Sequence, residues 1–155
     1  MKKIILFLFL LTSIVCLAEI KGVDFDKLNN VMLNNDYSID FDDDYVVYSK
    51  RDGKFEEELT FNIQNGDITS MRIYAWHHHL QPNQSKIVKN VKKIIQLLNK
   101  ATTNKQLIVD LNKGVAKIKN DVNNGTTDFN TLEFKEYIIR TTNSSKQKEV
   151  GVSID

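Results

Sequence analysis

The 155-residue sequence holds 21 basic and 20 acidic residues, and this near-neutral balance argues against a dedicated nucleic-acid-binding protein. With one proline, six glycines and no low-complexity tract, it also does not have the composition of a disordered chain or a long linker. The length is that of one ordinary domain, and a single cysteine excludes a disulfide framework.

Residues 1–18 have the pattern of a secretory signal peptide. Two lysines precede an uninterrupted apolar run over residues 4–10, and mostly apolar residues continue to Ala18, the small residue expected before a cleavage site. The run is short for a membrane anchor, and the valine before Cys16 is unusual for a lipoprotein signal. We therefore predict an exported protein, periplasmic or extracellular, with a single domain over residues 19–155.

Charge is distributed unevenly along the predicted mature chain, which keeps 19 basic and 20 acidic residues once the two lysines of the signal peptide are removed. Residues 19–67 hold 13 acidic and 5 basic residues, whereas residues 68–109 hold seven basic residues and no acidic one. Residues 110–155 hold seven of each. This segregation predicts a domain with oppositely charged faces, unless the two blocks neutralise each other in the fold.

The mature chain is expected to begin with a short helix over residues 23–35. Asp24 is a suitable N-cap, and apolar residues follow at helical spacing: Phe25, Leu28, Val31 and Met32. Residues 37–41 then alternate between apolar and polar as in a strand, and the acidic residues 42–44 follow as a solvated turn.

Residues 45–79 predict an antiparallel meander, because β-rich runs are separated by glycine turns at Asp52-Gly53 and Asn65-Gly66. The apolar residues of the second and third runs are both odd-numbered, so they share a face only if the connection contains an odd number of residues. We therefore predict a three-residue loop, 64–66, with Gly66 in the left-handed conformation of a bulge. The opposite face then carries Arg72, Tyr74, Trp76 and His78.

Two longer amphipathic helices are predicted next, over residues 84–101 and 105–122. Opposite the apolar stripe of the first helix lie five lysines: Lys86, Lys89, Lys92, Lys93 and Lys100. Leu97 lies among these lysines and is expected to be exposed. Residues 129–142 and 148–154 then predict a C-terminal hairpin with a phase slip near Glu136, where the apolar residues change from even to odd numbers.

This order of elements predicts an α+β domain. Its antiparallel sheet would consist of a three- to four-stranded meander and the C-terminal hairpin, with one short N-terminal helix and two longer helices packed on one face. No sequence motif identifies a family, and folds of this class serve unrelated functions.

The histidine cluster is the leading candidate for a metal site. In an extended strand His77 and His79 point to the same side and can chelate one metal ion, with a third ligand from the acidic turn at residues 42–44 if the sheet brings it near. The alternative is an exposed loop edge. Glu56 and Glu58 share a strand face, either as paired carboxylates or as solvated groups that pair with Lys50 and Arg51.

Catalytic motifs are otherwise missing from the sequence: it has no nucleophile elbow, no phosphate-binding loop and no thiol in the mature chain. We therefore predict a small exported, non-catalytic binding domain without a cofactor, whose partner is another protein or an envelope component. Arg72, Tyr74, Trp76 and His78 are its predicted contact residues, because aromatic residues flanked by charge anchor protein interfaces.

Two alternative functions are left open by the sequence. One is a small metal-dependent or other envelope hydrolase that uses His77, His79 and nearby carboxylates. The other is weak attachment to an anionic surface or lipid headgroups through the lysines of the helix over residues 84–101.

Overall fold

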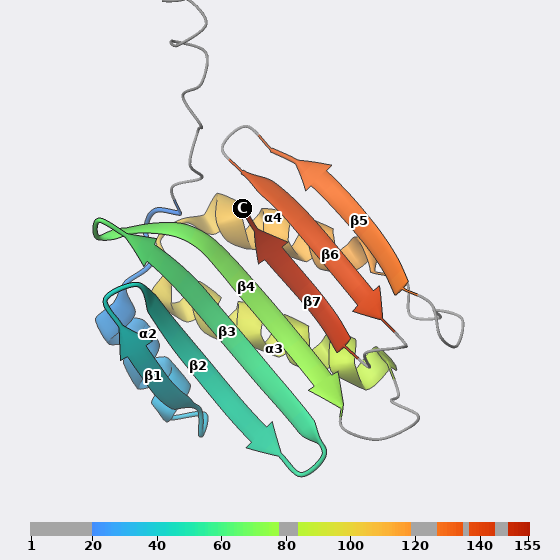
Figure 1. The fold of residues 1–155 in the computed structure, drawn as a ribbon, viewed down its shortest axis with the longest axis horizontal. Coiled ribbons are helices and arrows are strands. Elements are labelled where there is room, and N and C mark those ends of the chain that lie inside the picture. The colour runs from blue at the N-terminus through green and yellow to red at the C-terminus, as the bar shows by residue number, and fades with distance from the viewer. Residues whose placement is uncertain (1–19, 78–83, 119–126, 135–136, 145–148) are drawn as a thin grey trace, which may run out of the picture.

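The computed structural model describes residues 20–77, 84–118, 127–134, 137–144 and 149–155 (Figure 1). The predicted signal peptide lies outside these residues. The elements in chain order are α2 (Phe25–Leu33), β1 (Ser38–Asp42), β2 (Tyr45–Asp52), β3 (Phe55–Gln64), β4 (Asp67–His77), α3 (Gln84–Ala101), α4 (Lys105–Lys117), β5 (Thr127–Glu133), β6 (Ile138–Ser144) and β7 (Glu149–Ile154).

All strands join one seven-stranded antiparallel sheet in the order β1-β2-β3-β4-β7-β6-β5. The helices cover one face of this sheet, and the other face carries no element of the described chain (Figure 1). The α+β prediction is confirmed, but the sheet is larger than the predicted meander and hairpin. We call the uncovered side the open face.

The additional strand comes from the C-terminal third of the chain. Residues predicted as one strand with a phase slip form two strands, β5 and β6, which pair with each other. The amide of Phe134, just after β5, donates over 2.9 Å to the carbonyl of Tyr137, just before β6, and holds these two strand ends together. The apolar residues therefore change from even to odd numbers because the chain reverses direction between β5 and β6. Glu136, where a phase slip was predicted, lies outside the described residues.

Strand β7 is an interior strand of the sheet, next to the central strand β4. It pairs with β6 on one side and with β4 on the other, so it joins the meander to the C-terminal hairpin (Figure 1). Its inward side chains are fully buried under α3 and α4: Val150, Val152 and Ile154.

The β3–β4 turn is tighter than predicted. Gln64 pairs with Asp67, so the loop contains only Asn65 and Gly66. Both residues have positive φ, 54° and 86°, as a two-residue type I′ turn requires, and an Asn-Gly pair is the favoured sequence for it. The prediction of a three-residue loop is therefore wrong.

A bulge in β4 contains the extra residue that is needed for the odd-numbered apolar residues of β3 and β4 to share one face of the sheet. Ile63 pairs with Ile68 and Asn62 with Ser70, which leaves Thr69 unmatched. Beyond this bulge Leu59 lies opposite Ile73, and both are fully buried against the helices. The assignment of the two faces of β4 is thus confirmed, although the extra residue lies in the strand and not in the loop.

The two helix starts that have resolved caps follow the usual chemistry. The Asp24 carboxylate accepts from the Lys27 amide over 3.0 Å, as predicted, and the Asn104 side chain accepts from the Leu107 amide over 3.0 Å. α4 is shorter than predicted because the backbone leaves the helical conformation at Ile118 and becomes extended there.

Leu97 is buried, contrary to the prediction that it is exposed. α3 lies between α2 and α4 on the sheet and contacts both, so its flanks are covered as well as its sheet-facing side (Figure 1). The prediction assumed that α3 buries only one stripe of side chains, and it therefore placed Leu97, on the flank of the helix, in solvent.

Two buried carboxylates tie helices to the sheet. Glu57, at 5% exposure on β3, accepts from the Tyr37 hydroxyl and lies 3.6 Å from Lys93 Nζ on α3. Asp110, at 2% exposure on α4, accepts from Tyr137. Burial opposes ionisation of Asp110, but hydrogen bonds from three side chains outweigh it and hold the pKa of the carboxyl below its usual value: Lys113, Gln106 and Tyr137.

Candidate functional site

Three of the four predicted contact residues occupy successive alternate positions of β4 and so lie on the open face of the sheet. Tyr74 and Trp76 are half-buried and Arg72 is exposed, while the intervening Ile73 and Ala75 are fully buried on the helix side. This alternation is that of a strand with one covered face. The fourth residue, His78, lies outside the described residues.

Register places acidic residues on both sides of the two aromatic rings. Tyr74 lies opposite Glu58 of β3, and Trp76 lies opposite Glu149 of β7. These four residues line a shallow hollow of about 320 Å³ on the open face. We call them the open-face cluster: Glu58, Tyr74, Trp76 and Glu149.

A glycine in β7 positions the tyrosine. Gly151 lies opposite Tyr74, and a Cβ atom at Gly151 would come within 2.4 Å of the Tyr74 ring carbon Cε1. The ring therefore packs directly over the glycine backbone, in space that any other residue would fill. This packing half-buries the ring and fixes one wall of the hollow.

We expect Gly151→Ala to displace the Tyr74 ring and to lower the free energy of unfolding by roughly 1–3 kcal/mol, the usual cost of overpacking. Urea unfolding measures the loss, and the NMR shifts of the Tyr74 ring report its displacement. Ser153→Ala, on the same strand and the same face, is the control and should change neither. An unchanged Tyr74 spectrum in Gly151→Ala would show that the ring does not rest on the glycine.

The two carboxylates of the open-face cluster raise the negative potential of the hollow. Burial, and then the charge of Glu58, raise the pKa of Glu149 above its usual value. Burial also raises the pKa of Tyr74; the charge of Arg72 opposes this increase, and those of Glu149 and Glu58 add to it. Glu58 itself accepts from the Thr60 hydroxyl over 2.7 Å. A cation placed in the hollow would relieve the repulsion between the carboxylates.

The chemistry of the lining suits the binding of a positively charged group. Aromatic faces attract ammonium and guanidinium groups, and carboxylates pair with the same groups by charge-assisted hydrogen bonds. The four lining residues include no hydroxyl, thiol or amine nucleophile beside a general base, apart from the phenol of Tyr74, whose raised pKa keeps it protonated. The arrangement can therefore recognise a cationic group.

The acidic half of this cluster was only partly visible in the sequence. Glu56 and Glu58 do share a face, and Arg51 lies opposite Glu56. The expected pairing with Lys50 is not found, because Lys50 lies opposite Glu57 and pairs with Asp36 over 3.1 Å. In addition, β3 is an interior strand and not a solvated edge. Glu149 gave no sequence signal, because only the long-range pairing of β7 with β4 brings it to the hollow.

The structure separates His77 from the acidic turn at residues 42–44. His77 lies on the helix side of β4 with its ring 4.4 Å from that of Phe55, whereas His78 and His79 lie outside the described residues. The turn at residues 42–44 adjoins the opposite end of β3, where the Ile63 amide donates to the Asp44 carbonyl. The suggested third ligand is therefore not a neighbour of His77. Within the described ranges, no three His, Cys, Asp or Glu side chains are grouped to hold a metal ion.

The lysines of α3 do not form one uniform surface. Lys86 Nζ lies 4.2 Å from the centre of the Phe55 ring, and Lys93 pairs with the buried Glu57, so these two extend toward the sheet. Lys89, Lys92 and Lys100 are exposed. The Lys93–Glu57 pair also links the basic block of the sequence to the acidic block. In the part of the chain that the structure describes, no helix has the length and apolar character needed to cross a membrane.

Comparisons with known proteins add no assignment to this geometry. The chain matches no protein-family model, no curated protein and no solved structure.

Proposed function

We propose that this protein is a small exported, non-catalytic binding domain that captures a protein or envelope component through a cationic group seated in the open-face cluster. One observation carries the proposal: two aromatic rings and two carboxylates line the same hollow of about 320 Å³ on the uncovered face of the sheet. The pattern of residues 1–18 supports export.

The expected contacts are specific. Trp76 and Tyr74 offer their ring faces to a lysine or arginine side chain, and Glu58 and Glu149 offer carboxylate oxygens to the same group. Each cation–π contact is worth about 0.5–2 kcal/mol, depending on how far it is removed from water. Arg72, at the end of the row, favours partners that present an acidic group beside the cationic one.

Titration calorimetry with a lysine-rich peptide tests the proposal, with a glutamate-rich peptide of the same length as the charge control. Trp76→Ala and Glu149→Gln should each weaken binding of the lysine-rich peptide by roughly 5–30-fold, which corresponds to about 1–2 kcal/mol. Glu133→Gln, an exposed glutamate on β5, is the matched control and should bind like the wild type.

Two results would contradict the proposal. One is equal binding by the wild type and Glu149→Gln, with no change in the fluorescence of the only tryptophan. The other is loss of the cooperative thermal transition in Trp76→Ala, which would place Trp76 in the core instead of the contact surface. Because a carboxylate must be ionised to attract a cation, binding should also strengthen as the pH rises through the raised pKa of Glu149.

A further inference from the structure

The edge of the sheet formed by β1 presents an unpaired strand. β1 is outermost in the strand order and pairs only with β2 in the described part of the chain. Its sequence, Ser-Ile-Asp-Phe-Asp, contains neither the proline nor the lysine that often protects an edge strand, and no bulge interrupts its register with β2. Its outward backbone groups are therefore available to a further strand.

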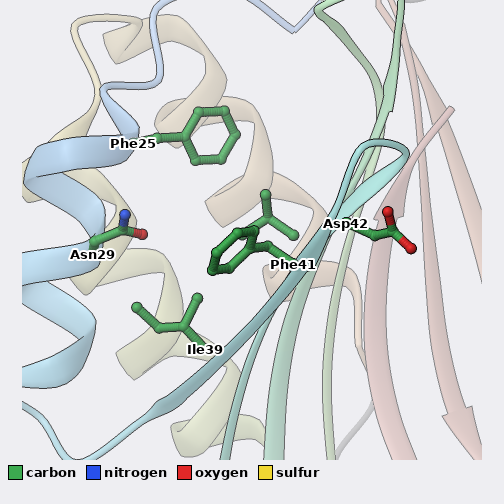
Figure 2. A pocket seen from close by; sticks show the side chains of 6 residues that line it. Phe25, Asn29, Ile39, Phe41 and Asp42 are labelled. Carbon is green, nitrogen blue, oxygen red and sulfur yellow. The ribbon is translucent and has the colours of Figure 1, made fainter.

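An apolar pocket lies directly beside this edge. It has a volume of about 270 Å³ and lies between β1 and α2; its lining residues are Phe25, Asn29, Ile39, Phe41, Asp42 and Val46. Figure 2 shows Ile39 and Phe41 extending from β1 toward α2, with Phe25 above them on the helix side. The volume lies below the roughly 300–1,000 Å³ of typical small-molecule sites, so it suits one or two side chains better than a whole organic ligand.

Phe41 explains why the pocket is open. It lies opposite Val46 and on the same face as the buried Phe61, yet 75% of its surface is exposed. The helix side of an interior strand is closed by neighbours on both sides, whereas among the described residues β1 has a neighbouring strand on one side only. The hydrophobic core is thus left exposed at this edge, and one more strand would cover the Phe41 ring.

The charge around the edge indicates what kind of strand fits. Asp40 and Asp42 lie on the open-face side of β1, and Asp43 and Asp44 follow in the turn; all four are exposed. In Figure 2 the Asp42 carboxylate points away from the Phe41 ring. Two copies of β1 paired edge to edge would place aspartates against aspartates, which is unfavourable. The charge of β1 therefore disfavours a second copy of this chain as the occupant and favours a basic partner.

We propose that β1 accepts an eighth strand from a partner protein: an extended basic peptide in which bulky apolar residues alternate with lysine or arginine. Backbone hydrogen bonds to the β1 edge supply the pairing, as in other cases of strand addition. Because side chains alternate across a strand, the apolar residues enter the Phe41 pocket while the basic residues face Asp40 and Asp42. This site lies at the edge of the sheet, separate from the open-face cluster, and goes beyond the function proposed above.

A synthetic peptide of alternating leucine and lysine tests this proposal on the folded domain by calorimetry and NMR hydrogen exchange. We expect the amides of β1 to gain protection. Two methylated peptides are compared, each with methyl groups on one of the two sets of alternate backbone nitrogens. The peptide whose blocked nitrogens face β1 should bind about tenfold or more weakly, because it loses the backbone hydrogen bonds to the strand. The charge and the side chains are the same in both peptides.

Variants of the domain separate the two binding sites. Asp40→Lys combined with Asp42→Lys should abolish protection of β1, and Phe41→Ala should weaken binding about tenfold. Trp76→Ala should retain the protection of β1, because Trp76 lies on a different strand and outside the pocket.

Three outcomes would overturn the proposal. Equal affinity of the two peptides that carry methyl groups on opposite sets of alternate backbone nitrogens would reduce the contact to charge attraction. Protection confined to β4 and β7 would assign the peptide to the open-face cluster. Dimerisation of the free domain through β1 would make a second copy the occupant.

Discussion

Raising the pH from about 9 to about 12 is expected to destabilise the domain by roughly 3–5 kcal/mol. Tyr48 is fully buried, and its burial raises the pKa of the phenol to about 12. Tyr37 is also buried, and burial together with the hydrogen bond and charge of Glu57 raises the pKa of Tyr37 further. In the folded state both phenols retain their proton well above pH 10, whereas the unfolded chain releases it near pH 10. High pH therefore favours the unfolded chain.

The direction of this dependence follows from the raised pKa values. The stability contributed by the two phenols is complete below about pH 10, where both states are protonated, and it is lost as the pH rises through the pKa of the folded state. Urea unfolding at successive pH values measures the slope. Tyr48→Phe should make the slope shallower, although it also costs the hydrogen bond from Tyr48 to the Asn29 side chain. A free energy of unfolding that stays constant up to pH 12 would contradict the prediction.

Phe61→Ala is expected to be among the most destabilising single substitutions, at about 3–5 kcal/mol. The Phe61 ring is fully buried and packs edge to face against Phe25, at 5.3 Å, and against Tyr48, at 6.3 Å. It therefore links β3 to α2 and to β2, and its removal leaves a cavity among all three elements.

The same truncation on the surface provides the control for this prediction. Phe129 on β5 is 71% exposed, so Phe129→Ala should change the free energy of unfolding by no more than about 0.5 kcal/mol. Urea unfolding of the two variants in parallel measures the difference. Similar losses at Phe61 and Phe129 would show that the Phe25–Phe61–Tyr48 contacts do not stabilise the core.

Features set by neighbouring residues were predictable from the sequence. The N-cap at Asp24 and the bounds of α3 follow from capping chemistry and helical periodicity, which act over a few residues. The strong turn sequence Asn65-Gly66 likewise marks the β3–β4 hairpin. Parity also showed that the connection needs one unmatched residue. It did not locate that residue, because a bulge at Thr69 and a longer loop restore the same alternation.

Features set by long-range pairing were not predictable. The strength of the β6–β7 hairpin gives no indication that β7 also pairs with β4, and that pairing alone brings Glu149 beside Trp76. The Phe41 pocket is equally hidden, because the sequence alternation of β1 resembles that of a covered strand. Only the strand order shows that nothing in the described chain covers this edge.

The insertion of β7 between β4 and β6 slows the folding of the domain. The pairing of Met71 with Ile154 closes a loop of roughly 80 residues, and proteins rich in such distant contacts fold slowly because the entropy of closure is lost before the contacts form. Strands β1 to β4 can assemble earlier by local hairpins, but the edge of β4 then stays unpaired. Until the last strand inserts, that exposed edge is the part of the molecule most prone to aggregation.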